Sequence, residues 1–239
     1  MRPAILLQLG SVDYLAALEL QRELHRLRHN GTIEDTLLLL EHPPVITIGR
    51  RANKKNLLVS EEELARRGIK VYQIERGGDI TYHGPGQLIG YPIFHLGAGL
   101  LGVRRFVEGV EQALIFALKK VGVDAGVKPK QIGVWVQDKK IASLGIAVKD
   151  HITLHGFALN VQGDLAGFQL INPCGLNPSV MTTIERAGGP TAMPLVRKAV
   201  IAGFEQVFGI KFQKNLPRSL TSLTKRLSVF CISSASDRE

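Results

Sequence analysis

Short apolar runs dominate the first hundred residues of the chain. Runs of about four to eight apolar or alternating residues, bounded by turn residues, predict β-strands. The predicted strands cover residues 4–9, 36–40, 45–48, 69–74 and 87–94. Pro92 in the last run indicates an edge strand or a bulge, because proline has no N–H to give to a ladder.

Apolar positions recur at helical spacing in four segments. The first predicted helix follows Ser11, a residue typical of an N-cap, and ends at Asn30-Gly31. Ser60 and Glu63 form a capping box for a short helix that Gly68 ends. Two longer helices are predicted over residues 103–121 and 191–208, the second with a proline tolerated in its first turn.

Three strand-like runs follow one another closely in the second half, over residues 132–136, 141–148 and 152–161. They predict an antiparallel meander, with a turn at 137–140, and residues 210–212 predict a last strand. The mixture predicts an α+β fold: a mixed, mostly antiparallel sheet flanked by helices. We expect one domain over residues 1–215 and a basic, Ser/Thr-rich, loosely ordered tail over 216–239.

Composition changes this picture little. The chain has 239 residues, 45% of them hydrophobic, and no apolar run reaches the roughly 18 residues that suggest a membrane span. The apolar segment at the start is too short for a signal peptide. Two cysteines, Cys174 and Cys231, are too few for a disulfide framework or a cysteine-rich zinc site. We expect a cytoplasmic monomer with free thiols.

The formal net charge of +9 suits an acidic partner, whether nucleic acid, a membrane surface or a protein. The sequence contains no helix-turn-helix and no zinc-finger spacing, and aromatic residues make up only 6%. We therefore expect no nucleic-acid partner, and an acidic protein remains a good candidate. A basic surface that serves only solubility explains the charge equally simply.

A glycine-rich stretch from Arg76 to Gln87 reads R-G-G-D-I-T-Y-H-G-P-G-Q. The pair Gly77-Gly78 allows the backbone to approach a ligand closely. The stretch lies between two predicted strands and lacks the lysine motif of a P-loop. A glycine pair alone is typical of a turn, but the polar side chains gathered in this loop favour a binding role.

Cys174 and Lys140 are the candidates for nucleophilic chemistry. Cys174 stands in N-P-C-G-L, which predicts a loop, although a free cysteine is commonly a small buried hydrophobe. Lys140 opens the apolar run K-I-A-S-L-G-I-A-V; alone it is a typical solvated turn lysine, but at the mouth of an apolar pocket it would lose hydration. An amine close to a thiol favours the attacking thiolate, so the pair indicates acyl transfer.

The histidines are ambiguous. His155 lies in an apolar strand, where a buried structural histidine and a site residue are equally good interpretations, and His42 before Pro43-Pro44 is similar. The histidines at 42, 83, 151 and 155 have no spacing typical of metal ligands, so we predict no metal.

At these residues the chain resembles the lipoyl(octanoyl) transferases, which belong to the biotin/lipoate protein ligase superfamily. The matching stretches are R-G-G-D-I-T-Y-H-G-P-G-Q-L-I-G-Y-P (76–92), G-V-W-V-x-x-x-K-I-A-S-L-G-I (133–146), H-I-T-L-H-G-F-A-L-N-V (151–161) and I-N-P-C-G-L (171–176). The resemblance runs from about residue 5 to about residue 210.

The resemblance implies the fold of that superfamily and an acyltransferase activity. It implies that octanoyl passes from octanoyl-acyl carrier protein to a specific lysine of lipoyl domains, in 2-oxoacid dehydrogenase E2 subunits and the glycine cleavage H protein. Lipoyl-acyl carrier protein is an alternative donor. No cofactor of the enzyme itself is implied, because phosphopantetheine arrives on the donor. Arg50, Arg51, Lys54 and Lys55 are candidates for steering the acidic carrier protein.

The same resemblance implies roles for individual residues. Cys174 is the nucleophile that forms an acyl-thioester, and Lys140 activates it, either as a general base or only by lowering its pKa. Backbone N–H groups near Leu144-Gly145 are candidates for the oxyanion. His42 and His155 are candidates for supporting roles. The acyl site is expected to be lined by Arg76, Gly77, Gly78, Asp79, Ile80, Thr81, Tyr82, His83, Ser143, Leu144, Gly145, Gly156, Phe157 and Ala158.

Two other functions compete with this one. An ATP-dependent lipoate or biotin ligase would share the fold but needs no nucleophilic cysteine, and the G-R-G-R-x-G loop of biotin ligases is absent. A non-enzymatic protein that binds nucleic acid or anionic lipid through its basic tail predicts that Cys174→Ser changes nothing.

Overall fold

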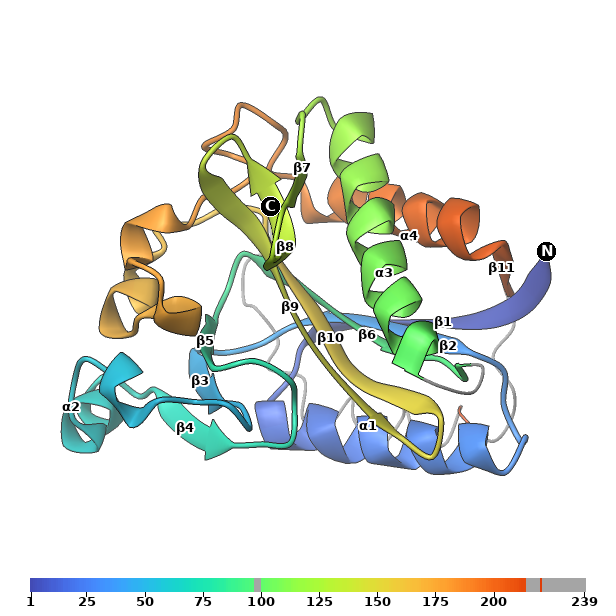
Figure 1. The fold of residues 1–239 in the computed structure, drawn as a ribbon, viewed down its shortest axis with the longest axis horizontal. Helices are drawn as coiled ribbons and strands as arrows, with labels where there is room; N and C mark the ends of the chain where they lie inside the picture. Colours follow the sequence, from blue (N-terminus) through green and yellow to red (C-terminus); the bar gives the residue numbers. More distant parts are fainter. Residues whose placement is uncertain (97–99, 214–219, 221–239) are drawn as a thin grey trace, which may run out of the picture.

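The computed structural model of the chain describes residues 1–96, 100–213 and 220 (Figure 1). Its main sheet has eight strands in the order β11-β1-β2-β6-β10-β9-β8-β7. β1 pairs in parallel with β2 and β11, and the other neighbours are antiparallel, which confirms the predicted mixed, mostly antiparallel sheet. The strands are β1 (Arg2–Ser11), β2 (Thr36–Glu41), β6 (Gln87–Ile93), β7 (Gly126–Lys128), β8 (Gln131–Val136), β9 (Lys139–Lys149), β10 (Ile152–Asn160) and β11 (Ile210–Gln213).

Helices cover both faces of this sheet. α1 (Tyr14–His29) lies along one face, and α3 (Leu100–Lys120) and α4 (Met193–Phe208) lie on the other (Figure 1). The apolar run of β2 has no polar alternation because both of its faces are buried. Leu38 packs on the α1 side, and Leu37 packs on the side of α3 and α4.

A second, three-stranded sheet lies beside the first, in the order β4-β3-β5. It consists of β3 (Val45–Ile48), β4 (Lys70–Gln73) and β5 (Ile80–His83), and α2 (Glu61–Arg66) lies between β3 and β4 along the chain. Ile46, Ile80, Leu64 and Phe168 form its core. The sequence predicted β3 and β4 as strands, but β5 was wrongly interpreted as loop because its four residues lie between two glycine turns.

Two other local predictions were wrong. Asp13, not Ser11, is the N-cap of α1, because its carboxylate accepts hydrogen bonds from the N–H groups of Leu15 and Ala16, whereas Ser11 ends β1. Pro92 does not mark an edge, since β6 lies between β2 and β10. Proline is tolerated there because the pairing of β6 with β10 stops at Gly90.

Four short 3₁₀ turns of the described chain lie in two connections, one between β3 and α2 and three between β10 and α4. They are η1 (Lys54–Asn56), η2 (Ala166–Leu170), η3 (Pro173–Gly175) and η4 (Pro178–Val180). η1 and η3 are joined by a hydrogen bond of 2.8 Å from the N–H of Asn172 to the carbonyl of Asn56. The segment before α4 is therefore held against the small sheet.

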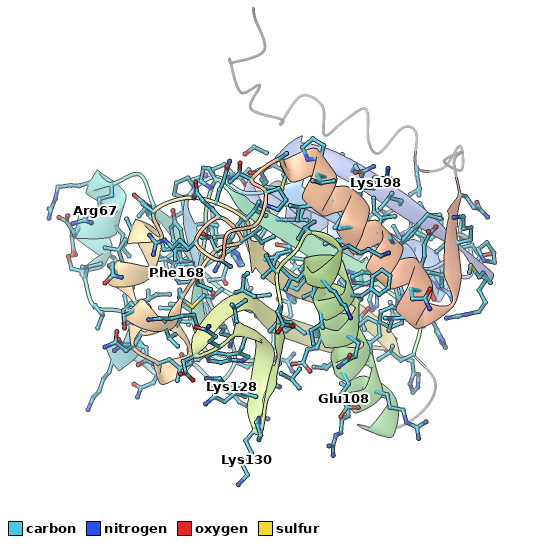
Figure 2. All side chains as sticks on the ribbon, turned by 90° about the horizontal axis from the view of Figure 1, so that it is seen from above. Arg67, Glu108, Lys128, Lys130, Phe168 and Lys198 are labelled. Carbon is cyan, nitrogen blue, oxygen red and sulfur yellow. The ribbon has the colours of Figure 1, made fainter. Side chains whose placement is uncertain are left out.

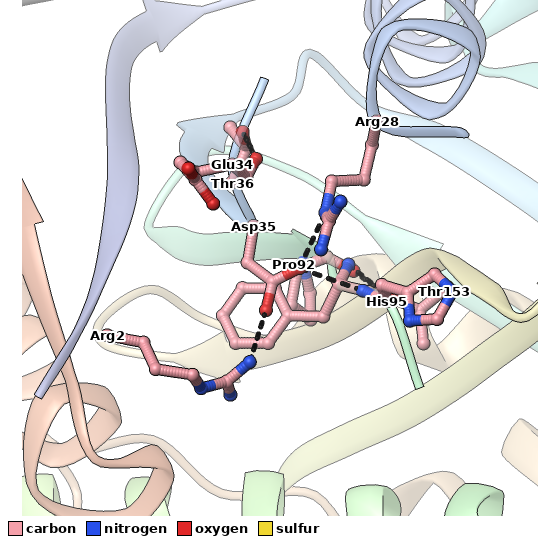
Figure 3. A network of polar contacts seen from close by, with 9 residues as sticks. Arg2, Arg28, Glu34, Asp35, Thr36, Pro92, His95 and Thr153 are labelled. Atoms are coloured by element: carbon pink, nitrogen blue, oxygen red, sulfur yellow. Dashed lines mark hydrogen bonds and ion pairs between the residues drawn. The ribbon is translucent and has the colours of Figure 1, made fainter. Parts of the chain in front are cut away.

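Asp35 ties three separate segments together at one end of the main sheet (Figure 3). Its buried carboxylate accepts from Nε of Arg28 in α1 at 2.8 Å and from the backbone N–H of His95 at 2.9 Å. Arg2 at the start of β1 lies 3.5 Å away. A buried carboxylate with these partners is compensated, so we assign it to fold stability.

Most of the predicted tail, and with it Cys231, lies outside the described residues. Leu220 is described and is fully buried in the core that α1 covers. None of the helices in the described parts is long and apolar enough to cross a membrane.

Candidate active site

A cavity with about 550 Å³ of space, part of it open to solvent, lies where β9 and β10 meet the small sheet and the start of α1. It is lined by Tyr14, Arg76, Thr81, His83, Tyr91, Lys140, Ser143, Leu144, Gly145, His155, Gly156, Phe157, Ala158 and Pro173. Segments that are far apart in the sequence therefore meet at one site.

The paired strands β9 and β10 form one wall. Ser143, Leu144 and Gly145 stand opposite Ala158, Phe157 and Gly156 in register. Within the described part of the chain, β8 pairs with β9 only as far as Ala142. The backbone beyond Ala142 can therefore border the cavity.

The backbone of the glycine-rich stretch packs directly against the backbone of β9. The N–H of Gly77 donates to the carbonyl of Ile146 at 3.3 Å. A Cβ on Gly77 would lie 2.9 Å from that carbonyl oxygen, and a Cβ on Gly145 would lie 3.1 Å from the Gly77 oxygen. Both positions need glycine for this close approach of two backbones.

Arg76 is a buried cation in the cavity wall, with 6% of its surface exposed. Its guanidinium donates to the hydroxyl and the carbonyl of Thr47, at 3.1 and 2.7 Å, and to the carbonyl of Gly77 at 3.0 Å. These bonds fix the loop to β3 and bring a permanent positive charge to the site.

Lys140 lies in β9 and not in the turn predicted for it, and only 6% of its surface is exposed. Its carbonyl accepts a hydrogen bond of 3.0 Å from the N–H of Thr182, and it forms a parallel bridge with Met181. Its Nζ lies 5.4 Å from the centre of the Trp135 ring. The segment that follows Cys174 is thus attached to the strand that carries the lysine.

Cys174 is the central residue of the 3₁₀ turn η3, and its side chain lies outside what the structure describes. Pro173, which precedes it, lines the same cavity as Lys140. Gly175 has a φ of 74°, a left-handed conformation that favours glycine. The turn whose central residue is Cys174 therefore borders the cavity that Lys140 also lines.

One ring nitrogen of His83, Nδ1, forms a hydrogen bond with a neighbouring side chain. Its Nδ1 lies 3.0 Å from Oε1 of Gln87, and Gln87 in turn donates to the Asn160 side chain. Because the amide oxygen accepts, Nδ1 carries the proton, and Nε2 is the basic nitrogen. Burial, reinforced by His42, lowers the pKa of His83 to about 3, so the ring is neutral.

Tyr14 and Tyr91 line the cavity, although sequence reasoning did not assign them to it. The sequence places Tyr14 on the apolar face of the first helix, and the structure shows that this first residue of α1 also lines the cavity. The ring of Tyr14 stacks on that of His83 with centroids 6.3 Å apart. The hydroxyl of Tyr91 donates to Nε2 of His42, whose Nδ1–H donates to the carbonyl of Val12, both at 2.7 Å.

His155 combines a strained backbone with burial. Its φ is 58° within a strand, and 2% of its surface is exposed. Its Nε2 makes no hydrogen bond within the described residues and lies 4.0 Å from Oε2 of Glu75. Burial lowers its pKa, and the Glu75 carboxylate opposes this. Strain at a cavity wall is typical of functional positions.

Some residues expected at the acyl site lie behind it. Tyr82 packs edge-on against Phe168, and Ile80 lies in the core of the small sheet. The Asp79 carboxylate accepts from the N–H of Asn53 and the side chain of Asn56. Gly77, Gly78 and His42 also support the lining residues and do not line the cavity themselves. Among the described residues, no cluster of His, Cys, Asp or Glu is placed to hold a metal ion.

Comparison with known proteins points in one direction. Residues 13–205 match the family model of the lipoyl protein ligase A/B catalytic domain. The octanoyltransferase of Caldicellulosiruptor saccharolyticus is 49% identical, over 86% of this chain and 88% of its own. That of Solibacter usitatus is 46% identical, over 87% of this chain and 94% of its own.

Solved structures share the fold at low identity. A lipoate-protein ligase A bound with ATP superposes with a TM-score of 0.76 at 18% identity, over 95% of this chain and 94% of its own. A bipartite lipoate protein ligase from Thermoplasma acidophilum, described with its E2 lipoyl domain, superposes with a TM-score of 0.74. It is 19% identical, over 95% of this chain and 92% of its own. The predicted biotin/lipoate protein ligase-like fold is confirmed.

Proposed function

The chain belongs to the octanoyltransferases of the lipoyl protein ligase A/B catalytic family and is an acyltransferase, and from this premise we propose its reaction in detail. It transfers octanoyl from octanoyl-acyl carrier protein to a specific lysine of a lipoyl domain. Cys174 carries the acyl group between the two as a thioester. The acceptors are E2 subunits of 2-oxoacid dehydrogenases and the glycine cleavage H protein, and the reaction takes place in the cytoplasm.

One observation supports this proposal most directly. The buried Lys140 and the turn that carries Cys174 border one cavity, and its wall on β9 and β10 includes the apolar or small residues Leu144, Gly145, Gly156, Phe157 and Ala158. An ammonium close to a thiol favours its thiolate, and only a few per cent of an ordinary thiol is ionised at neutral pH. The small residues Gly145, Gly156 and Ala158 in the cavity wall favour an acyl chain as the ligand, because they leave space beside the backbone.

The first half-reaction forms the acyl-enzyme. The thiolate of Cys174 attacks the carbonyl carbon of the donor thioester, and a tetrahedral oxyanion forms. The pantetheine sulfur then leaves on the carrier protein as a thiol, having taken a proton from the Lys140 ammonium, which becomes a neutral amine. The backbone of Leu144 and Gly145, which borders the cavity, is our candidate for the oxyanion donors. Arg76 adds a fixed positive charge to the same wall.

The second half-reaction forms the amide. The ε-amine of the acceptor lysine attacks the Cys174 thioester, the carbon–nitrogen bond forms, and the Cys174 thiolate is released. The proton that the amine loses returns to the Lys140–Cys174 pair. One lysine then serves both steps, first as a cation beside the thiolate and then as the site that receives a proton.

Acyl binding rests on apolar burial. At ~0.8 kcal/mol for each buried CH₂, full burial of the octanoyl methylenes contributes an upper figure of about 5 kcal/mol. That is enough to keep the chain anchored in the cavity and to distinguish chains of different length.

Intact mass measurement tests the thioester. Incubated with octanoyl-acyl carrier protein and no acceptor, the wild-type protein should gain one octanoyl group, and Cys174→Ala should gain none. Cys231→Ala is the matched control and should react as the wild type does. Acylation that survives Cys174→Ala, or that disappears in Cys231→Ala, would refute the proposed nucleophile.

A parallel incubation separates transfer from ligation. Free octanoate, ATP and a lipoyl domain replace the acylated carrier protein. Octanoylation of the lipoyl domain under these conditions would favour a ligase and contradict the transferase.

A further inference from the structure

Glu111 of α3 is a buried carboxylate that does not line the cavity, with 8% of its surface exposed. Its Oε1 accepts a hydrogen bond of 2.8 Å from the backbone N–H of Gly133. Burial and, to a smaller extent, the neighbouring Glu108 carboxylate raise its pKa, and the Gly133 bond and the charge of Lys140 counteract this rise. A buried carboxylate is unfavourable unless it is compensated, so these two contacts explain how it is tolerated.

Gly133, in β8, has a φ of 130°, a conformation that favours glycine. A Cβ at this position would lie 2.5 Å from Cε of Lys140 and 2.6 Å from the carbonyl oxygen of Ala142. The register between β8 and β9 also shifts next to this residue, between Val134 and Trp135. Gly133 therefore leaves the space in which the Lys140 side chain lies.

The ammonium of Lys140 lies at the end of that space. Its Nζ is 3.1 Å from the point where a Gly133 Cβ would stand and 5.4 Å from the centre of the Trp135 ring. The Nζ of Lys128 lies 4.8 Å from the same ring centre and is paired with Asp138. Glu111 of α3 accepts the hydrogen bond of Gly133, and Gly133 in turn lies against the Lys140 side chain. The carboxylate is also close enough to Lys140 for their charges to interact.

We propose that Glu111 is a positioning residue: it holds the Gly133 backbone in the conformation that leaves room for Lys140, and so fixes the Lys140 ammonium at the cavity. The effect on acyl transfer rests on the proposed function. The effect on the position of Lys140 does not.

Three variants separate the steps of this argument. Glu111→Ala removes the acceptor of the Gly133 N–H, and Gly133→Ala places a methyl group where Lys140 lies. Glu111→Gln keeps an acceptor oxygen of nearly the same shape. Glu108→Gln is the matched control, because Glu108 projects from the same helix into solvent, 53% exposed, and pairs with Arg104 (Figure 2).

The first measurement follows Lys140 itself. Each folded variant is labelled with acetic anhydride, and mass spectrometry of peptides compares Lys140 with the exposed Lys149. Labelling of Lys140 should rise several-fold in Glu111→Ala and Gly133→Ala and stay unchanged in Glu111→Gln and Glu108→Gln. Thermal unfolding confirms that each variant is folded.

The second measurement is single-turnover formation of the acyl-enzyme from octanoyl-acyl carrier protein. In Glu111→Ala and Gly133→Ala the maximal rate should fall by on the order of 10²-fold, because a misplacement of about 1 Å has such an effect. The donor concentration at half-maximal rate should change little. Glu111→Gln should stay close to the wild type.

The outcomes distinguish this inference from the proposed function. Unchanged Lys140 labelling in folded Glu111→Ala and Gly133→Ala would overturn the inference, and so would a loss in Glu111→Gln equal to that in Glu111→Ala. If the wild type acquires no octanoyl group while labelling still rises in the two variants, the positioning role holds and the proposed function fails.

Discussion

Lys140 places a positive charge where little water can solvate it, since only 6% of its surface is exposed. A buried ammonium is stabilised by nearby anions, and an ionised thiol at the same cavity would be one of them. The charge of Lys140 and the ionisation of Cys174 should therefore depend on each other. The pH dependence of acylation reports this coupling directly.

Lys140→Met keeps the length and the apolar part of the side chain and removes its charge. At pH 7 the variant should form the acyl-enzyme at least tenfold more slowly, because its thiol then ionises with an ordinary pKa of about 8.5. Its rate should rise about tenfold for each pH unit below that value, whereas the wild-type rate should rise less. Single-turnover mass measurements from pH 6.5 to 8.5 test this.

Lys149→Met is the control for this experiment, because Lys149 ends the same strand and is exposed. It should match the wild type at every pH. A wild-type rate and pH profile in Lys140→Met would show that the lysine does not activate the thiol.

Two histidines are neutral inside the protein for the same physical reason. Burial lowers the pKa of His42 to about 4 and that of His83 to about 3. The unfolded chain binds a proton at each of them near pH 6.5, so the unfolded state binds more protons below that pH. Their contribution to stability is complete above about pH 6.5 and is lost as the pH falls toward 4.

His42→Gln should weaken this acid sensitivity, because glutamine can still donate to Val12 and accept from Tyr91 but does not titrate. Between pH 6 and pH 5 the wild type should lose up to about 1.4 kcal/mol more unfolding free energy than the variant. Urea unfolding at both pH values measures the difference. His29→Gln, at an exposed position of α1, should behave as the wild type, and an equal pH slope in all three proteins would contradict the assignment.

At the scale of elements, β10 leaves no room for a side chain at Gly156, where it faces β6. A Cβ on Gly156 would lie 2.1 Å from the carbonyl oxygen of Gly90 and 2.6 Å from Cδ of Pro92. Backbone atoms cannot rotate away as side chains do, so this approach requires glycine. The same glycine leaves room at the cavity wall.

Gly156→Ala should therefore destabilise the fold by about 1–3 kcal/mol or more, as overpacking does. Gly126→Ala, in the edge strand β7, is the matched change, because a Cβ there would meet no atom within 4 Å. Its effect should be within about 0.5 kcal/mol. Thermal and urea unfolding compare the two, and equal stabilities would contradict the proposed close approach.

The sequence predicted most elements because their apolar periods are regular. The meander of β8, β9 and β10 and the helices α1, α3 and α4 follow from local spacing. β5 and the separate small sheet were not predicted, because four residues between glycine turns carry no period, and because the division of strands between two sheets depends on long-range pairing.

The residues of the candidate site also fall into two groups, those that could be predicted from the sequence and those that could not. Residues in the glycine-rich stretch and around Lys140 and Cys174 could be named from their sequence context. Tyr14 and Glu111 could not, because each is one more position on an amphipathic helix until the packing shows what it faces. Lys140 illustrates the limit, since its turn-like neighbours gave no sign of its burial.

At the scale of the whole molecule, the small sheet closes one side of the cavity and carries a basic rim. The segment after β3 holds Arg50 and Arg51, whose N–H groups donate to the carbonyls of Arg76 and Gly78 at 3.2 Å. Both arginines are exposed, as is Lys55 in η1, the turn bonded to the segment of Cys174. The rim thus adds positive charge beside the expected entry of an acidic carrier protein.

Charge reversal tests whether this rim steers the donor. Arg50→Glu combined with Arg51→Glu should lower kcat/KM for octanoyl-acyl carrier protein about tenfold or more at low salt, because a like charge slows encounter. The variant should also lose most of the decrease in rate that added salt causes in the wild type, since salt screens the charges that the variant lacks.

Arg104→Glu with Arg105→Glu is the control, because both residues are exposed on α3 and lie away from the small sheet (Figure 1). This double variant makes the same change in net charge and should have a much smaller effect on kcat/KM. If both double variants lower kcat/KM equally, net charge and not the rim guides the donor, and if neither does, steering plays no part in the reaction.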